Sequence, residues 1–316
     1  MKSSAKNPLV TIGIPTYNRA HKLRKVIERS LAQTYRNLEI IVSDNCSSDQ
    51  TPELVRSITD PRLRYFRQET NIGPNNNFNY CLSQARGEYF LLFHDDDMID
   101  EDFAEACIAS LRPGKSVGAI LTGVRIINEH DDVLKEHENR ATAESASEFI
   151  RGWFRGQTAL YLCSTLYNTV KLNEIGGFRS KKNLYDDLVP TFTLVTQYGR
   201  ADVPGIKASF LRHSSNRGAT VSIDDWVEDG RYLLDVICRL LPDDCRALRS
   251  EGNRYLCRKM YQYVATGTAV SHSPLDYLRI YRAFDYCYSP LHHFYGKKLR
   301  RQVRRLKRIL AGNPRA

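Results

Sequence analysis

Two hydrophobic periods alternate along the first 122 residues of the chain. Short apolar runs that are typical of buried strands occupy residues 9–14, 38–43, 63–67, 89–93 and 117–122. Amphipathic segments that are typical of helices occupy residues 20–31, 52–58, 76–85 and 101–111. Strands and helices that alternate over short connections predict βαβ units, and therefore an α/β fold with a mostly parallel sheet flanked by helices.

The pattern changes beyond residue 123. Residues 124–220 contain irregular strand-like segments, a Gly176–Gly177 pair and helix-like stretches near 145–155 and 186–198. From about residue 224 only helical periodicity is present, at residues 225–241, 244–266, 274–288 and 292–311. We therefore expect a main domain over residues 1–222, with halves at about 8–122 and 123–222, and a helical C-terminal region over residues 223–316.

The composition is that of a folded, water-soluble protein. Of the 316 residues, 42% are hydrophobic and 26% are charged, and there is no low-complexity tract. The longest apolar runs, such as residues 89–93, are far too short to cross a bilayer, and the first ten residues lack the apolar segment of a signal peptide. We expect a cytoplasmic protein.

Eight cysteines are scattered along the chain without a C-x-x-C pair. This spacing predicts neither a zinc site nor a disulfide framework, and several of the cysteines lie inside apolar periodic segments. We therefore expect small core residues in a reducing compartment.

Nearly all of the net charge of +10 lies at the C-terminus. There is no acidic residue beyond Asp285, and nine lysines and arginines there leave the rest of the chain at about +1. In residues 295–311 the apolar side chains recur on one helical stripe with cations elsewhere, which favours an amphipathic helix on an anionic membrane surface. A helix that packs its stripe on the domain is the plain alternative. Nucleic acid is the least favoured partner, because no DNA- or RNA-binding motif accompanies the cations.

A polar cluster follows each of the first four predicted strands. The clusters lie at residues 15–19, 44–51, 69–77 and 94–97. Since ligands bind at the carboxyl ends of the strands in such sheets, we expect the four clusters to converge on one cleft. None of them reads G-x-G-x-x-G or G-x-x-x-x-G-K-S/T, so neither a Rossmann dinucleotide site nor a P-loop is indicated.

Asp95, Asp96 and Asp97 stand side by side after the fourth strand. Adjacent carboxylates stay ionised together only where a cation or hydrogen-bond donors compensate them. Mg²⁺ and Mn²⁺ take such oxygen ligands together with substrate phosphates, so the triplet predicts a divalent metal site. Capping of the following helix is the alternative, but Asp100, Glu101 and Asp102 already supply acids for that role.

Six segments that occur in order carry a resemblance to a known family. They are TIGIPTYNR (11–19), IIVSDNCSSDQT (40–51), NIGPNNNFNYCLSQARGEYFLLFHDDD (71–97), GGF (176–178), YDD (185–187) and RHSSNR (212–217). Together they resemble the inverting family 2 glycosyltransferases, which use nucleotide-diphospho-sugars and have the GT-A fold. The resemblance covers about residues 8–220 and leaves the helical C-terminal region outside.

The resemblance implies a role for each matching residue on the nucleotide side. Tyr17 would stack on the nucleobase and Asp44 would accept a hydrogen bond from the edge of the base; a core aromatic and a helix cap are the alternatives. Asp95 would lie near the ribose or the sugar. The other positions expected to contact the nucleotide-sugar are Pro15, Thr16, Asn18, Arg19, Asn71, Gly73, Asn79, Arg212 and Arg217.

For the metal, the resemblance implies that Asp96 binds an ion on the diphosphate. The neighbouring Asp97 could assist either Asp95 at the sugar or Asp96 at the metal. His213 matches a histidine that reaches the metal or the diphosphate, with a purely structural histidine as the alternative. Mn²⁺ or Mg²⁺ is the expected ion. His94 stands where many members have the first acid of D-x-D-D.

Two other positions depart from the family pattern. Asn45 replaces an acid that often follows the second strand, and Phe78 stands where a basic residue is common. These departures leave the expected fold unchanged, but they leave the identity of the nucleobase open.

The reaction also needs a carboxylate apart from the metal site. Sugar transfer is a displacement at the anomeric carbon, and the acceptor hydroxyl must lose its proton to a positioned base. Asp186 and Asp187 start a predicted helix, and the resemblance implies that the second acid of this pair is the base. We expect Asp187 to be the base and Asp186 to orient the acceptor; a helix-capping pair is the alternative.

The leading hypothesis is a metal-dependent inverting glycosyltransferase with UDP as the expected donor nucleotide and a glycan or lipid-linked acceptor. It would act in cell-surface polysaccharide synthesis, as a cytoplasmic protein peripheral to the inner face of the plasma membrane. A sugar-1-phosphate nucleotidyltransferase would need a glycine-rich basic loop after the first strand, and residues 15–23 are not one. A non-catalytic membrane or nucleic-acid adaptor is the third hypothesis.

Overall fold

A single sheet organises the chain. The computed structural model describes residues 7–213, 220–270, 273 and 275–294, and within them nine strands form this sheet in the order β3-β2-β1-β4-β8-β6-β9-β5, with β7 paired to β6. The strands are β1 (Val10–Thr16), β2 (Leu38–Asp44), β3 (Leu63–Arg67), β4 (Tyr89–Leu92), β5 (Met98–Ile99), β6 (Ala119–Ile127), β7 (Val133–His137), β8 (Thr165–Asn168) and β9 (Arg200–Leu211).

The first four strands form a parallel half. β2 pairs in parallel with β1 and β3, and β1 pairs in parallel with β4. The strand expected at residues 117–122 is β6, but β8 lies between β4 and β6 and is antiparallel to both. β6 pairs in parallel with β9. The α/β fold is therefore confirmed, and its second half is mixed because β8 runs against its neighbours.

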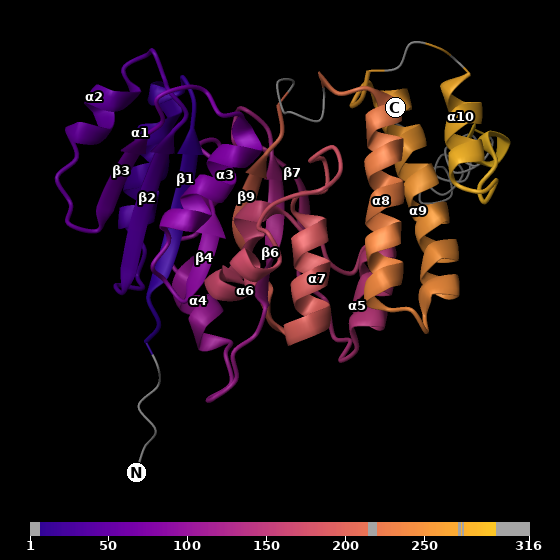
Figure 1. Cartoon of the computed structure of the whole chain (residues 1–316), viewed down its shortest axis with the longest axis horizontal. Helices are drawn as coiled ribbons and strands as arrows, with labels where there is room; N and C mark the ends of the chain where they lie inside the picture. The colour runs from indigo at the N-terminus through magenta and orange to yellow at the C-terminus, as the bar shows by residue number, and fades with distance from the viewer. Residues whose placement is uncertain (1–6, 214–219, 271–272, 274, 295–316) are drawn as a thin grey trace, which may run out of the picture.

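Helices flank the sheet and then continue beyond it. They are α1 (Ala20–Leu31), α2 (Thr51–Arg56), α3 (Pro74–Gln84), α4 (Phe103–Ala109), α5 (Ala146–Phe154), the 3₁₀ turn η1 (Leu162–Ser164), α6 (Thr169–Glu174), α7 (Leu188–Tyr198), α8 (Ile223–Leu240), α9 (Cys245–Thr266) and α10 (Asp276–Ala283). Figure 1 shows α8, α9 and α10 side by side at one end of the molecule, with α7 between them and the sheet.

Strand β4 illustrates how the sheet is buried on both faces. Successive side chains of a strand point to opposite faces, so Tyr89 and Leu91 pack in one apolar cluster while Phe90 and Leu92 pack in the other. Gly13 on the neighbouring β1 leaves room for Phe90, because a Cβ at this position would lie 2.6 Å from the Phe90 ring. The all-apolar strand pattern in the sequence follows from this double coverage.

The C-terminal helices share a core with the sheet. The cluster that contains Phe90 and Leu92 continues through Leu233 of α8 and Leu256 of α9 to Ile280 of α10, all of them buried. Burial of one such side chain contributes about 1.5–3 kcal/mol. The helical region therefore packs onto the rest of the molecule through the same core rather than through a polar interface.

The structure corrects two expectations. Cys238 at the end of α8 and Cys245 at the start of α9 form a disulfide, so the expectation of unpaired cysteines is wrong for this pair, while the other six cysteines are free. Asp100 was expected to cap the following helix, but α4 begins at Phe103 and the Asp100 carboxylate accepts a hydrogen bond from Arg125 Nη1 at 3.0 Å.

The basic stretch at residues 295–311 lies outside the described residues, and so does Arg217. Among the described helices, none combines the length and the apolar character that a membrane span requires.

Candidate active site

A cleft of about 510 Å³ opens at the carboxyl ends of β1, β2 and β4. Residues from all four predicted polar clusters line it, as expected for the ligand-binding edge of a parallel sheet. The lining residues that the sequence singled out for a role are Pro15, Thr16, Tyr17, Arg19, Asn71, Asp95, Asp96, Asp186 and His213.

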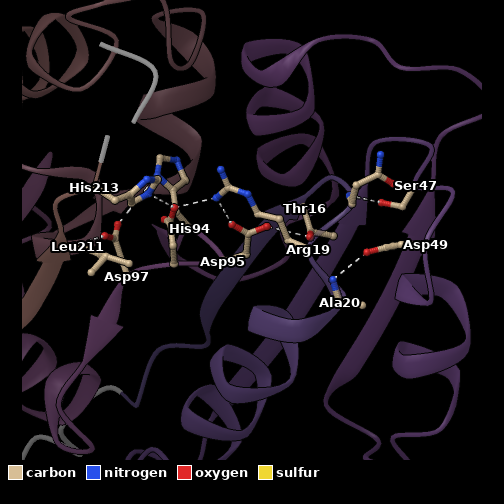
Figure 2. Close-up of polar contacts among 12 residues, drawn as sticks. Thr16, Arg19, Ala20, Ser47, Asp49, His94, Asp95, Asp97, Leu211 and His213 are labelled. Carbon is tan, nitrogen blue, oxygen red and sulfur yellow. Dashed lines mark hydrogen bonds and ion pairs between the residues drawn. The ribbon is translucent and has the colours of Figure 1, made fainter. Parts of the chain in front are cut away.

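Asp95 and Asp96 share one cationic partner. Arg19 Nη1 lies 2.8 Å from Asp95 Oδ1 and 2.7 Å from Asp96 Oδ2, and Thr16 Oγ1 donates to Asp95 Oδ2 at 2.9 Å. Figure 2 shows Arg19 reaching to Asp95 from the end of β1, with His94 and His213 beyond its guanidinium. The first and fourth polar clusters thus meet through an ion pair, and this corner of the cleft stabilises positive charge.

The environment sets the ionisation of the two carboxylates in opposite directions. Burial raises the pKa of Asp95 to about 6, although the charge of Arg19 opposes the shift. Burial would also raise the pKa of Asp96, but the charge of His94, the hydrogen bond from His213 and the charge of Arg19 outweigh it and lower this pKa. Asp96 is therefore the more acidic of the two carboxylates, which suits a metal ligand.

A group of metal-binding side chains surrounds Asp96. One ligand atom each of His94, Asp96 and Asp97 lies within 4.8 Å of the others, and His213 Nε2 is 3.0 Å from Asp96 Oδ2. Two carboxylates with imidazoles form a donor set that suits Mn²⁺ and accommodates Mg²⁺. The residues fit a divalent ion. We did not assign His94 to this group from the sequence. The signal that could have identified it is that His94 occupies the position of the first acid of the family's D-x-D-D motif.

Asp97 is held away from the cleft opening. It is buried, its Oδ1 accepts a hydrogen bond from Leu211 N at 3.1 Å, and its Oδ2 lies 3.9 Å from His94 Nδ1. Burial, together with the negative charge of Asp96, raises the pKa of Asp97 well above its usual range. Through Leu211 this carboxylate ties the segment after β4 to the end of β9, close to His213.

Asp44 does not lie where the sequence placed it. The carboxylate is fully buried, and it accepts hydrogen bonds from Ser47 N at 2.8 Å and Tyr65 Oη at 2.7 Å. It is not among the residues that line the cleft, whereas its neighbour Asn45 is. Asn45 donates to Asn71 Oδ1 at 2.9 Å, so these two amides form one side of the cleft.

The loop after β2 fixes the turn after β1. Asn18 has a positive φ of 53°, its N–H donates to Ser47 Oγ at 2.9 Å, and its Oδ1 accepts from Ser48 N at 2.8 Å. Asp49 accepts from Ala20 N at 3.0 Å at the start of α1 (Figure 2). Asn18 thus shapes the turn that presents Tyr17, which is 46% exposed at the cleft.

Two other predicted binding residues have structural contacts. Gly73 is the N-cap residue of α3, with a positive φ of 81° that favours glycine. Asn79 accepts from Phe178 N at 2.8 Å and donates to Phe178 O at 3.2 Å, which joins α3 to the Gly176–Gly177 turn. Arg212 is exposed, and neither it nor Asn79 lines the cleft.

Asp186 and Asp187 stand at the other wall of the cleft. Asp186 lines the cleft and accepts a hydrogen bond from Asn75 Nδ2 at 2.6 Å. Asp187 is half-buried next to it and caps α7, with Leu188 N donating to its Oδ1 at 2.7 Å. Burial raises the pKa of Asp187 to about 7; the charge of Asp186 adds to the shift and the charge of Lys259 opposes it.

Several other lining residues were not assigned a binding role from the sequence. Phe78 stacks against His94 with ring centroids 4.9 Å apart, and Trp226 reaches the cleft from α8. The others are Asn45, Pro74, Asn77, Leu162, Asn183, Leu184 and Phe210. Most of the apolar ones belong to the second half of the chain or to the helical region, where no motif marks them.

Comparisons with known proteins identify the family and the fold of the chain. Residues 11–173 match the model of the family described as Glycosyl transferase family 2. Over 174 residues the chain is 32% identical to the GalNAc(5)-diNAcBac-PP-undecaprenol beta-1,3-glucosyltransferase of Campylobacter jejuni, covering 53% of this chain and 55% of that protein. Over 97 residues it is 38% identical to the succinoglycan biosynthesis protein ExoO of Rhizobium meliloti, covering 31% of this chain and 28% of that one. The chain thus spans about half the length, or less, of these curated relatives.

Two solved structures have the same fold. TarS 1-349 of S. aureus in complex with UDP-GlcNAc superposes with a TM-score of 0.67 at 19% identity, over 87% of this chain and 80% of that one. The mannosyltransferase PcManGT of Pyrobaculum calidifontis in complex with GDP-Man and Mn²⁺ gives a TM-score of 0.52 at 19% identity, over 93% and 85%. The expected GT-A fold is confirmed.

Proposed function

Because the chain belongs to glycosyl transferase family 2, we propose that it moves a sugar from a nucleotide-diphospho-sugar to a hydroxyl of a glycan or lipid-linked acceptor, with inversion at the anomeric carbon. The observation that carries the proposal is the two-walled cleft. A cation-stabilising group of acids and histidines forms one wall, and a separate carboxylate pair forms the other. A nucleotidyltransferase is not favoured by the family assignment.

The donor would bind against the strand exits. Tyr17 offers an exposed ring on which a nucleobase can stack. Asn45 and Asn71 offer amide groups to the edge of that base. This assignment replaces Asp44, whose oxygens are occupied inside the fold. UDP remains the expected nucleotide, supported by the UDP-GlcNAc complex of TarS, while the GDP-Man complex of PcManGT makes GDP the alternative.

Asp96, Asp97 and His213, with His94, would hold Mn²⁺ or Mg²⁺. When bound, the ion acts as a Lewis acid that stabilises the negative charge of the departing diphosphate. Asp95 and Arg19 border this group and would contact the sugar and the diphosphate, since Arg19 carries the planar fork that suits phosphate oxygens.

Asp187 would be the base. A new bond forms between the acceptor oxygen and the anomeric carbon, the bond from that carbon to the diphosphate oxygen breaks, and the acceptor proton passes to the Asp187 carboxylate. A pKa of about 7 leaves a large fraction of this carboxylate ionised near neutral pH and makes it a better proton acceptor than an ordinary aspartate. Asp186, which is already held by Asn75, would orient the acceptor.

An anionic membrane surface is the proposed location. Five of the nine exposed large hydrophobic side chains among the described residues lie between residues 275 and 294, immediately before the basic stretch at 295–311: Leu275, Leu278, Tyr286, Leu291 and Phe294. An anionic bilayer interface binds apolar side chains by burying them and attracts neighbouring cations electrostatically. A lipid-linked acceptor would be presented at the same surface, on the cytoplasmic side of the membrane. Sedimentation with anionic vesicles should capture the wild type more strongly than Leu278→Asp/Leu291→Asp, and equal capture would contradict this location.

The experiment for the reaction is nucleotide release from a panel of UDP- and GDP-sugars with Mn²⁺, with and without candidate glycan acceptors. One donor class should be consumed only when metal is present, and NMR of the product should show the inverted anomer. No release from any donor, or retention of the anomeric configuration, would contradict the proposal.

A further inference from the structure

A buried carboxylate outside the cleft holds the segment that leads to Asp186 and Asp187. Asp229 on α8 is fully buried. Its Oδ2 accepts hydrogen bonds from Ser180 Oγ at 2.6 Å, Leu184 N at 2.7 Å and Tyr185 N at 3.1 Å. Its Oδ1 accepts from Lys182 N at 3.0 Å. All four donors come from residues 180–185.

These bonds replace regular structure in that segment. Residues 179–187 lie between the Gly176–Gly177 turn and α7 and belong to neither a helix nor a strand. Without a ladder of their own, their backbone N–H groups need another acceptor when they are buried, and one carboxylate can accept several bonds at once. Asp229 supplies that acceptor, and the donors in turn compensate its buried charge.

Other contacts from α8 reinforce the attachment. Trp226 packs edge-on against Tyr185, with ring centroids 5.5 Å apart. Lys182 Nζ lies 3.1 Å from Asp225 and 3.0 Å from Glu228. The lysine pairs are largely exposed and contribute little. The buried Asp229 is therefore the main anchor of the segment.

We propose that Asp229 is a positioning residue for sugar transfer, which fixes the segment 180–185 so that Asp186 and Asp187 meet the acceptor in a reactive geometry. The proposal rests on the proposed function of these two acids. It also assigns α8, which lies outside the family match, to the working enzyme. A displacement of a reacting group by about 1 Å can cost 10²-fold in rate, so loosening this segment should be visible in turnover.

Asp229→Asn tests the proposal with little change in volume. The amide has only one acceptor oxygen, so its NH₂ group must face either Lys182 N or the donors that now bind Oδ2. At least one of these hydrogen bonds is therefore lost, because the NH₂ group is itself a donor. Residues 179–187 carry three trypsin sites, Arg179, Lys181 and Lys182, and we expect cleavage at these sites to become faster. We expect turnover to fall by roughly 10- to 100-fold with a higher KM for the acceptor, while the Kd of the donor nucleotide stays within about twofold.

Asp235→Asn is the matched control, because Asp235 lies on the same helix and is half exposed in its pair with Arg249. Ser180→Ala removes a single donor to Asp229 and keeps the test open if Asp229→Asn fails to fold. It should give a smaller change of the same kind at a melting temperature close to that of the wild type.

Two outcomes would overturn the positioning role: unchanged cleavage and turnover in both variants, or faster cleavage with unchanged turnover. If Ser180→Ala weakens donor nucleotide binding as well as turnover, the role of Asp229 is structural only. Absence of transfer by the wild type with every donor would instead refute the proposed function.

Discussion

The two walls of the cleft are built in different ways. The proposed nucleotide wall consists of the exits of β1, β2 and β4, where each polar cluster directly follows a strand of the parallel half. The proposed acceptor wall consists of a segment without regular structure, which is held by a carboxylate on a helix more than forty residues further along the chain. The position of the first wall follows from the sheet topology, whereas the second depends mainly on buried tertiary contacts with α8.

This difference separates two kinds of chemistry. The nucleotide wall gathers groups that stabilise charge: Arg19 with Asp95, and Asp96 with His213. The acceptor wall holds a carboxylate with a pKa of about 7, which suits proton transfer. Changes on the first wall should therefore affect donor and metal binding, and changes on the second should affect turnover while leaving donor binding intact.

The largest effect is expected for Asp187→Asn. The amide cannot accept the acceptor proton, and loss of a positioned general base costs about 10²- to 10⁴-fold in rate. Nucleotide release with saturating acceptor measures this loss. Asp186→Asn on the same segment should cost less, because it removes an orienting group only; an equal or larger loss in Asp186→Asn would move the base from Asp187 to Asp186.

Asp96→Ala should lower transfer by roughly 10²- to 10³-fold, because the diphosphate loses its charge-stabilising ion. Its signature is the loss of metal dependence, so the residual rate should be the same with Mn²⁺ and with EDTA. Asp235→Asn, which changes a residue outside the cleft lining, should retain the full response to Mn²⁺. A metal response that persists in Asp96→Ala would place the ion elsewhere.

The pH dependence of kcat tests whether Asp187 is the group whose ionisation controls turnover. A base acts only when it is ionised, and an acid with a pKa of about 7 is ionised to about one tenth at pH 6 and nine tenths at pH 8. We therefore expect kcat to rise about tenfold over that range. Asp186→Asn removes a neighbouring negative charge and should move the midpoint down, and Lys259→Met removes a positive charge and should move it up. A midpoint unmoved by both would exclude Asp187 as the titrating group.

The smallest effects come from a matched pair on the nucleotide wall. Asn45→Ala should weaken the donor by about tenfold, since a buried hydrogen bond to the ligand is worth about 1.5 kcal/mol or less. It should also lower the melting temperature, because Ile72 N loses its acceptor, Asn45 Oδ1. Asp44→Asn should affect stability alone: it leaves Ser47 N or Tyr65 Oη without its acceptor, so the free energy of unfolding should fall by about 1–3 kcal/mol while donor affinity is kept. Kd by calorimetry and thermal unfolding of both variants provide the comparison.

The parallel half and its site were predictable from the sequence for a physical reason. Strand periodicity identifies β1, β2 and β4, and parallel strands bring their exits together, so Tyr17, Arg19, Asp95 and Asp96 could be placed in one cleft without coordinates. Asp44 was misplaced because neighbouring residues at a strand exit point in different directions. The sequence does not say which of Asp44 and Asn45 faces the cleft.

The acceptor wall was predictable only in part. The resemblance marked Asp186 and Asp187, but the role of Asp229 depends on how α8 packs, and helical periodicity does not encode the partner of a buried acid. Trp226 was missed for the same reason. The disulfide between Cys238 and Cys245 was missed because seven residues of spacing fix no geometry until two helices are known to meet.

The central claim is that one cleft has two walls with separate roles, and calorimetric titration of the donor nucleotide into wild type, Asp96→Ala and Asp187→Asn, each with Mn²⁺, tests it most directly. We predict that UDP or GDP binds the wild type and Asp187→Asn with the same Kd, and that binding to Asp96→Ala is weakened by at least about tenfold. Equal affinity in all three proteins, or equal weakening in both variants, would contradict the account.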